Sequence, residues 1–115
     1  MVRRRRSDPR RTAKAALAKE TREALDQARA AREGTAFFAA GRLAIQQQLG
    51  ALWNQPPQAI TTSEVQARLT EESPVVRFFR EADVLEYNRG NSGEVLPQWR
   101  ALLEEALASL TLFTR

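Results

Sequence analysis

The chain has 115 residues and a hydrophobic fraction of 43%, enough for one folded domain with a modest core. It contains no cysteine and no histidine, which excludes disulfides and thiolate–metal sites and removes the commonest general base. Residues 1–33 hold eleven Lys and Arg against five Asp and Glu, a net charge of +6, whereas residues 34–115 hold seven against nine, a net charge of −2.

The first eleven residues contain six arginines and no apolar periodicity, so we expect residues 1–11 to form a basic, disordered segment. No apolar run reaches the roughly 18 residues that span a bilayer, and no apolar signal-peptide stretch follows the arginines. We therefore expect the chain itself to be soluble. The basic residues of this segment that we expect to lie near a membrane are Arg3, Arg4, Arg5, Arg6, Arg10 and Arg11.

Residues 12–33 are rich in Ala, Lys, Glu and Arg, which are strong helix formers. Their only larger apolar side chains are Leu17 and Leu25, with alanines filling the rest of a thin stripe. This pattern predicts a charged lead helix from Thr12 to about Arg32, which is either exposed or packs through small residues.

The remainder, residues 34–115, has the apolar spacing of a helical domain. A core-facing helix follows Thr35, which can cap it, and ends before Pro56 and Pro57, which cannot continue the hydrogen-bond ladder. A capping box of Thr61 and Glu64 then predicts a short helix that ends near residue 69.

Ser73 and Pro74 are typical of the start of the next helix, which we expect over residues 74–88, followed by a turn-rich break. The last helix tolerates Pro97 only in its first turn. No stretch alternates convincingly as a strand. The sequence therefore predicts an all-α fold, a small bundle of about four core helices preceded by a basic, more exposed helix.

Little in the sequence points to catalysis, a metal or a cofactor. Adjacent carboxylates, such as Glu104 and Glu105, point about a third of a turn apart on a helix and are more simply a solvated face. The acidic residues of 74–88 lie beside Arg77 and Arg80, which suggests a surface ladder of ion pairs. Their excess over the arginines argues against a DNA-recognition helix. We expect no enzyme activity.

Trp53 and Tyr87 stand at helix ends beside polar turns, where each ring could cover the core or contact a partner. Covering the core is the simpler interpretation. Polar residues gather around the helix 61–70 and the turn 88–94, which makes these our candidate interaction surface. Its residues are Trp53, Glu64, Arg68, Tyr87 and Arg89.

Residues 35–110 resemble the C-terminal cytoplasmic region of BatD-type (oxygen-tolerance, aerotolerance-operon) membrane proteins. The resemblance rests on a Phe-Phe helix that ends in Leu-Trp, a proline pair that leads into "AITTSEVQARL", a helix end that reads "ADVLEYNRG", and a closing Leu-rich helix. It transfers no catalytic residue. Its signature positions, for which it implies a mainly structural role, are Trp53, Pro57, Tyr87 and Gly90.

The resemblance implies a cytosolic tail that follows outer β-rich domains and a single spanning helix, on the cytoplasmic side of the bacterial inner membrane. It also implies protein partners such as MoxR-type AAA+ ATPases or von Willebrand A-domain proteins. The N-terminal arginines would then be the positive-inside flank and lie near anionic lipid. We expect neither a small-molecule substrate nor a cofactor.

Our leading hypothesis is thus a non-enzymatic protein-interaction module that scaffolds or couples partner proteins. One alternative is a small nucleic-acid-binding protein with a basic N-terminal arm, although its folded part is mildly acidic, which makes nucleic acid a poor partner. A helical dimer formed through residues 12–33 is the weakest alternative, because the alanine stripe is thin.

Overall fold

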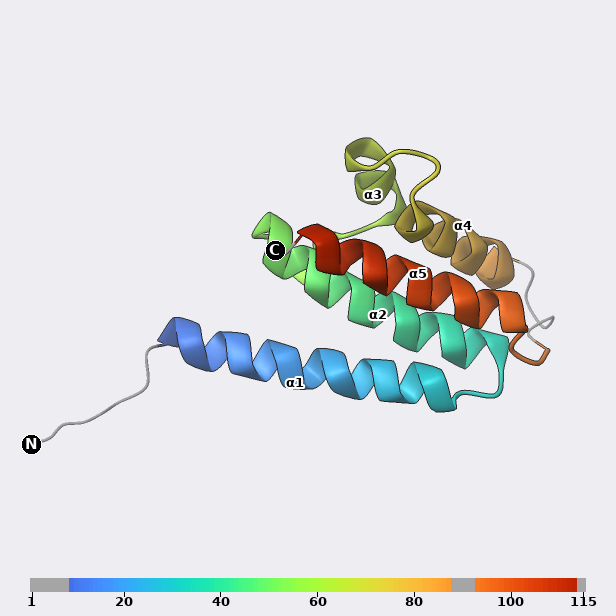
Figure 1. Ribbon diagram of the computed structural model, residues 1–115, viewed down its shortest axis with the longest axis horizontal. Coiled ribbons are helices and arrows are strands. Elements are labelled where there is room, and N and C mark those ends of the chain that lie inside the picture. Colours follow the sequence, from blue (N-terminus) through green and yellow to red (C-terminus); the bar gives the residue numbers. More distant parts are fainter. Residues whose placement is uncertain (1–8, 88–92, 114–115) are drawn as a thin grey trace, which may run out of the picture.

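The computed structural model describes residues 9–87 and 93–113, and the side chains of residues 16–87 and 93–110. Within these ranges the chain is a bundle of α-helices with no β-strand, so the predicted all-α fold is confirmed (Figure 1). The elements are α1 (Pro9–Ala30), α2 (Gly34–Trp53), the short 3-10 helix η1 (Pro57–Ala59), α3 (Thr62–Arg68), α4 (Pro74–Tyr87) and α5 (Pro97–Phe113).

Helix α1 lies along α2 and packs against it through small side chains (Figure 1). Ala24 and Ala28 are buried, and the hydroxyl of buried Thr21 donates a hydrogen bond of 3.1 Å to the amide oxygen of Gln47. Of the two arrangements that the sequence left open for this helix, packing through small residues is therefore observed. The helix begins at Pro9, three residues before the predicted start.

The C-terminal end of α1 is held by side chains of α5. The guanidinium of Arg100 donates to the carbonyl oxygens of Arg29 and Ala31, at 2.9 and 2.7 Å, and so satisfies two carbonyls at the helix end. Arg29 in turn donates twice to the carboxylate of Glu104, at 3.0 and 3.1 Å. This hydrogen-bonded pairing with Glu104 raises the pKa of Arg29 above its ordinary value.

We expect replacement of Arg100 with lysine to lower the free energy of unfolding by about 1 kcal/mol, because an ammonium group cannot bridge two carbonyl oxygens as a guanidinium fork does. Replacement with alanine is expected to cost more, since it also removes the charge. Denaturant titration followed by far-UV circular dichroism measures both. Unchanged stability in the alanine variant would contradict this role.

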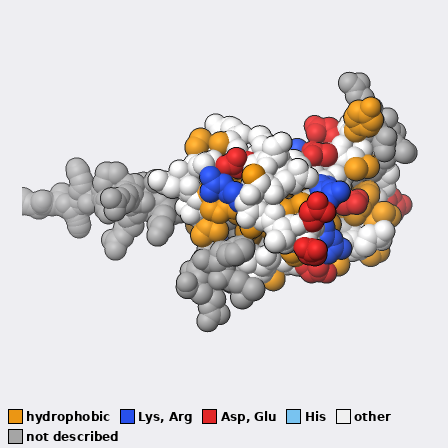
Figure 2. Space-filling view, turned by 90° about the horizontal axis from the view of Figure 1, so that it is seen from above, with side chains coloured by type: hydrophobic (Ala, Val, Ile, Leu, Met, Phe, Trp, Pro, Cys, Tyr) orange, Lys and Arg blue, Asp and Glu red, His pale blue; other side chains and the backbone are white. Residues whose placement is uncertain are grey.

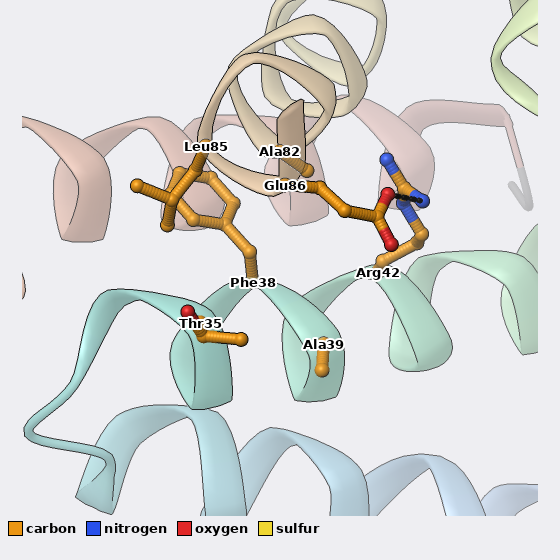
Figure 3. Close-up of a pocket in the computed structure, with 7 residues that line it drawn as sticks. All are labelled: Thr35, Phe38, Ala39, Arg42, Ala82, Leu85 and Glu86. Atoms are coloured by element: carbon orange, nitrogen blue, oxygen red, sulfur yellow. Dashed lines mark ion pairs between the residues drawn. The ribbon is translucent and has the colours of Figure 1, made fainter. Parts of the chain in front are cut away.

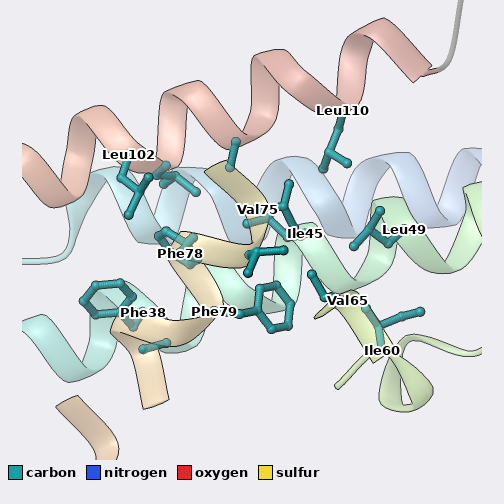
Figure 4. Packing of buried hydrophobic residues seen from close by; sticks show 14 of the residues in the cluster. Phe38, Ile45, Leu49, Ile60, Val65, Val75, Phe78, Phe79, Leu102 and Leu110 are labelled. Atoms are coloured by element: carbon teal, nitrogen blue, oxygen red, sulfur yellow. The ribbon is translucent and has the colours of Figure 1, made fainter. Parts of the chain in front are cut away.

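Four aromatic rings from three helices contact one another, three of them buried in the core and the fourth, Trp99, packed against it. Phe38 of α2 lies 4.9 Å from Phe78 of α4 and 5.0 Å from Trp99 of α5 between ring centroids, and Phe37 lies 5.9 Å from Phe78. A Cβ atom at Gly41 would come within 2.6 Å of the Phe78 ring, so glycine is what allows this close approach. The core continues from Phe38 and Phe78 toward Ile45, Leu49, Ile60 and Leu110 (Figure 4).

The predicted end of α2 is confirmed. Asn54 adopts a left-handed conformation with φ of 57°, and its backbone N–H donates to the carbonyl of Gly50, a common helix C-cap. The predicted cap at the start of α2 is wrong, because the helix begins at Gly34 and its N-cap is Glu33, without a side-chain hydrogen bond. Thr35 therefore lies inside the first turn.

Only half of the predicted capping box is formed at α3. The hydroxyl of Thr61 accepts a hydrogen bond of 3.2 Å from the backbone N–H of Glu64, as predicted. The Glu64 carboxylate does not return to Thr61, however, but accepts from Arg68 at 3.0 Å, and the Thr61 N–H donates to the carbonyl of Ala59. The prediction at α4 is confirmed, because the helix begins at Pro74 and the backbone N–H of Val75 donates to the Ser73 hydroxyl.

Candidate interaction surface

Three of the residues expected at an interaction surface lie together and engage one another. The guanidinium of Arg68 sits 4.7 Å above the ring of Trp53 and donates to the Glu64 carboxylate at 3.0 Å. The half-buried Trp53 ring packs against the core. This cluster joins α3 to the C-terminal end of α2, and it accounts for all three side chains within the fold; contact of these residues with a partner stays a prediction.

Tyr87 lies elsewhere, at the last residue of α4, and is 89% exposed. The simpler interpretation, in which this ring covers the core, is therefore wrong for Tyr87, whereas it holds for Trp53. Arg89 lies outside the described residues, as do the other residues of 88–92 and Arg3, Arg4, Arg5 and Arg6. Arg10 and Arg11 belong to the first turns of α1, where only the backbone is described.

A groove with a volume of about 530 Å³ runs between α4 and α5. Exposed Val84 lies on its α4 side and half-buried Trp99 on its α5 side. Tyr87 follows one helical turn after Val84. We call the lining of this groove, together with Tyr87, the α4–α5 face. The groove is lined in part by Arg77, Arg80, Glu81, Val84, Trp99 and Glu105.

The charged side chains of this face have no partner within the described part of the chain. Arg77, Arg80, Glu81 and Glu105 are all exposed, and their side chains take part in none of the ion pairs or hydrogen bonds of that part of the chain. Figure 2, which views the molecule from the side of α3 and α4, shows basic and acidic side chains interspersed with hydrophobic ones. The face therefore offers both charge signs and apolar surface to another molecule.

The ion-pair ladder predicted within residues 74–88 is not formed. Asp83 instead accepts hydrogen bonds from Arg42 of α2 and, at 2.7 Å, from the hydroxyl of Thr62 of α3. Asp83 therefore links α4 to both α2 and α3. The prediction paired Asp83 with arginines of its own helix. The packing of α2 against α4 instead brings Arg42 closer to Asp83.

A smaller pocket, of about 260 Å³, lies between α2 and α4 (Figure 3). Phe38 and Leu85 meet at one end of it, and Arg42 and Glu86 face each other at the other, with 3.9 Å between the charged atoms. Arg42 is only 25% exposed and is already engaged by Asp83, so we assign this pocket to the packing of the two helices.

Replacement of Asp83 with alanine is expected to lower the free energy of unfolding by about 2 to 3 kcal/mol, because it leaves the largely buried guanidinium of Arg42 without its close carboxylate. Replacement of Glu86 with alanine is the matched control. Glu86 is 77% exposed, so its loss is expected to cost less than about 0.5 kcal/mol. Equal effects in denaturant titrations of the two variants would contradict the role given to Asp83.

The described residues contain no group of three or more His, Cys, Asp or Glu side chains placed to hold a metal ion. None of the described helices is long and apolar enough to cross a membrane. Comparison of the sequence and the structure with known proteins finds no matching family model, no similar curated protein and no similar solved structure.

Proposed function

We propose that the chain is a non-enzymatic protein-interaction module and that the α4–α5 face is its contact surface. The observation that carries this proposal is the exposure of apolar side chains beside a groove, since Val84 is 57% exposed and Tyr87 is 89% exposed. Apolar side chains that remain in water on a folded domain, bordered by polar ones, are typical of contact sites. Tyrosine is also enriched among the residues that dominate binding energy at interfaces.

The non-enzymatic part of the proposal rests on the sequence. Without histidine or cysteine, the chain lacks the two side chains most easily tuned for proton transfer or nucleophilic attack near neutral pH. In the described part of the chain, Glu104 and Asp83 pair with arginines of other helices, and Glu64 pairs with Arg68 of its own helix. These features support a role in binding rather than in chemistry.

The class of partner is proposed from the resemblance of residues 35–110 to BatD-type cytosolic tails. It implies MoxR-type AAA+ ATPases or von Willebrand A-domain proteins, next to the cytoplasmic face of the membrane. An all-α domain with an exposed apolar face is compatible with such a scaffolding role.

Binding of purified MoxR-type and von Willebrand A-domain proteins from the same organism tests this proposal. We expect replacement of Val84 with aspartate to weaken binding at least about tenfold, because it places a charge on the apolar part of the face. Replacement of Leu43 with aspartate is the matched control, since Leu43 is a comparable exposed apolar residue on α2, at 43% exposure. Equal loss in both variants, or unchanged binding in the Val84 variant, would contradict the assigned surface.

We also propose that the N-terminal arginines lie against an anionic membrane surface. The split of charge supports this, because the basic residues precede a mildly acidic folded part. Each arginine near an anionic leaflet contributes roughly 1 kcal/mol of attraction.

Flotation with anionic vesicles is expected to show binding that weakens as salt is added, and a variant with the six arginines of residues 1–11 replaced by glutamine is expected to lose it. Duplex DNA and RNA are assayed beside the vesicles, because a basic arm on nucleic acid has the same salt sensitivity. Tight, sequence-selective nucleic-acid binding would overturn the membrane proposal in favour of the nucleic-acid alternative.

A further inference from the structure

The two sides of the α4–α5 groove carry complementary groups. Arg77 and Arg80 lie on the α4 side, and Glu105 lies on the α5 side. All three are exposed and have no ion-pair partner in the described residues. Glu81 also lies on the α4 side, so that wall carries a net positive charge of one, whereas the charged residue of the α5 wall is Glu105.

The order of these groups along the groove follows from the direction of the helices. Helices α4 and α5 run antiparallel (Figure 1), so residues early in α4 lie beside residues late in α5. Arg77 and Glu105 thus share one end of the groove, whereas Val84 and Trp99 share the other. Charged groups face each other at one end, and apolar groups face each other at the other end.

We propose that the α4–α5 face binds a second copy of this chain, with a twofold axis that runs along the groove. Such an axis lays α4 of one copy on α5 of the other and exchanges the two walls. Arg77 then meets Glu105 of the second copy, and the reciprocal pair forms at the same time, as in any isologous interface. Val84 meets Trp99 of the second copy in the same way. This inference rests on the proposed function, because it names a partner for the same face.

The balance of charges favours a second copy over an unrelated partner. The groove lining includes two arginines and two glutamates, Arg77, Arg80, Glu81 and Glu105. A ligand of one charge sign would satisfy half of these groups and be repelled by the other half. A second copy places its Glu105 opposite Arg77 and its Arg77 opposite Glu105, so each wall gains an opposite charge from the same chain.

Sedimentation velocity of the full chain over a wide concentration range tests the inference, and we expect a reversible monomer–dimer equilibrium. Arg77→Glu places two carboxylates opposite each other at both symmetry-related contacts, and Glu105→Arg places two guanidinium groups there. Each variant alone is expected to weaken dimerisation at least about tenfold. Arg22→Glu is the control for net charge, since Arg22 is an exposed residue of α1 and should leave dimerisation unchanged.

An equimolar mixture of the Arg77→Glu and Glu105→Arg chains is the decisive sample. In a mixed dimer both contacts again join opposite charges, so we expect the mixture to dimerise about as strongly as the original chain while each variant alone stays monomeric. Circular dichroism of each variant checks its fold, which neither substitution should disturb because neither residue is paired within the described part of the chain.

Three results would overturn the inference: a monomeric original chain at all concentrations, a dimer unaffected by both charge reversals, or variants whose mixture does not recover dimerisation. These results are distinct from failure of the proposed function. A strictly monomeric chain that binds the MoxR-type or von Willebrand A-domain protein through Val84 would refute the second copy and leave the interaction module standing. A dimer restored in the mixture, with neither protein bound, would do the reverse.

Discussion

Replacement of Phe78 with alanine is expected to lower the free energy of unfolding by about 4 kcal/mol. The Phe78 side chain is fully buried, and its ring contacts rings from α2, lying 4.9 Å from Phe38 and 5.9 Å from Phe37. It also fills the space that the absent side chain of Gly41 leaves open. Alanine would remove the ring and leave a cavity at the junction of α2, α4 and α5. The closely packed side chains around it can relax only partly to fill this cavity.

Denaturant titration measures this loss, with two controls. Phe78→Leu is expected to cost roughly half as much, because leucine retains most of the apolar volume. Tyr87→Ala is expected to change stability by less than about 0.5 kcal/mol, since Tyr87 is an aromatic residue of the same helix that lies almost entirely in water. A loss below about 1 kcal/mol in Phe78→Ala would contradict the position given to this ring.

A chain that begins at Gly34, and so lacks α1, is expected to lose cooperative folding. Helix α1 contributes Ala28 to the same buried cluster as Phe37, and its removal also deprives Arg100 and Glu104 of their partners. Domains of this size are stabilised by only about 5 to 15 kcal/mol in total. The stabilisation lost with one whole packed helix is expected to be a large part of this free energy of unfolding.

Thermal and denaturant unfolding of two truncated chains checks this expectation. A chain that begins at Pro9 keeps all of α1 and is expected to unfold cooperatively with the stability of the original. A chain that begins at Gly34 and still unfolds in a sharp, cooperative transition would contradict this role of α1 in the fold.

The helices of residues 34–115 could be predicted well because each has a strong local signal. Apolar spacing marks α2, α4 and α5, and the prolines at 57, 74 and 97 mark where helices stop or start. The docking of α1 could not be predicted in the same way. Its contacts use alanine and threonine, which carry little hydrophobic signal, and the pair of Arg29 and Glu104 joins residues 75 positions apart.

The candidate interaction surface could also be predicted only in part from the sequence. Trp53 and Tyr87 look alike in sequence, since each is an amphipathic ring at a helix end. Only the packing of α3 places Arg68 on the Trp53 ring, while Tyr87 receives no such cover. The α4–α5 groove was likewise not foreseen, because the residues of its two walls become neighbours only when the two helices pair.

Amide NMR spectra of the isotope-labelled chain test most directly whether the α4–α5 face is the contact surface. One series is recorded as the concentration of the chain is raised, and another as the candidate partner proteins are added. We predict that the perturbed amides gather on the outer positions of α4 and α5, around Val84, Tyr87 and Glu105. Perturbations confined to the surface of Trp53 and Arg68, or no perturbation in any of these titrations, would contradict the assignment.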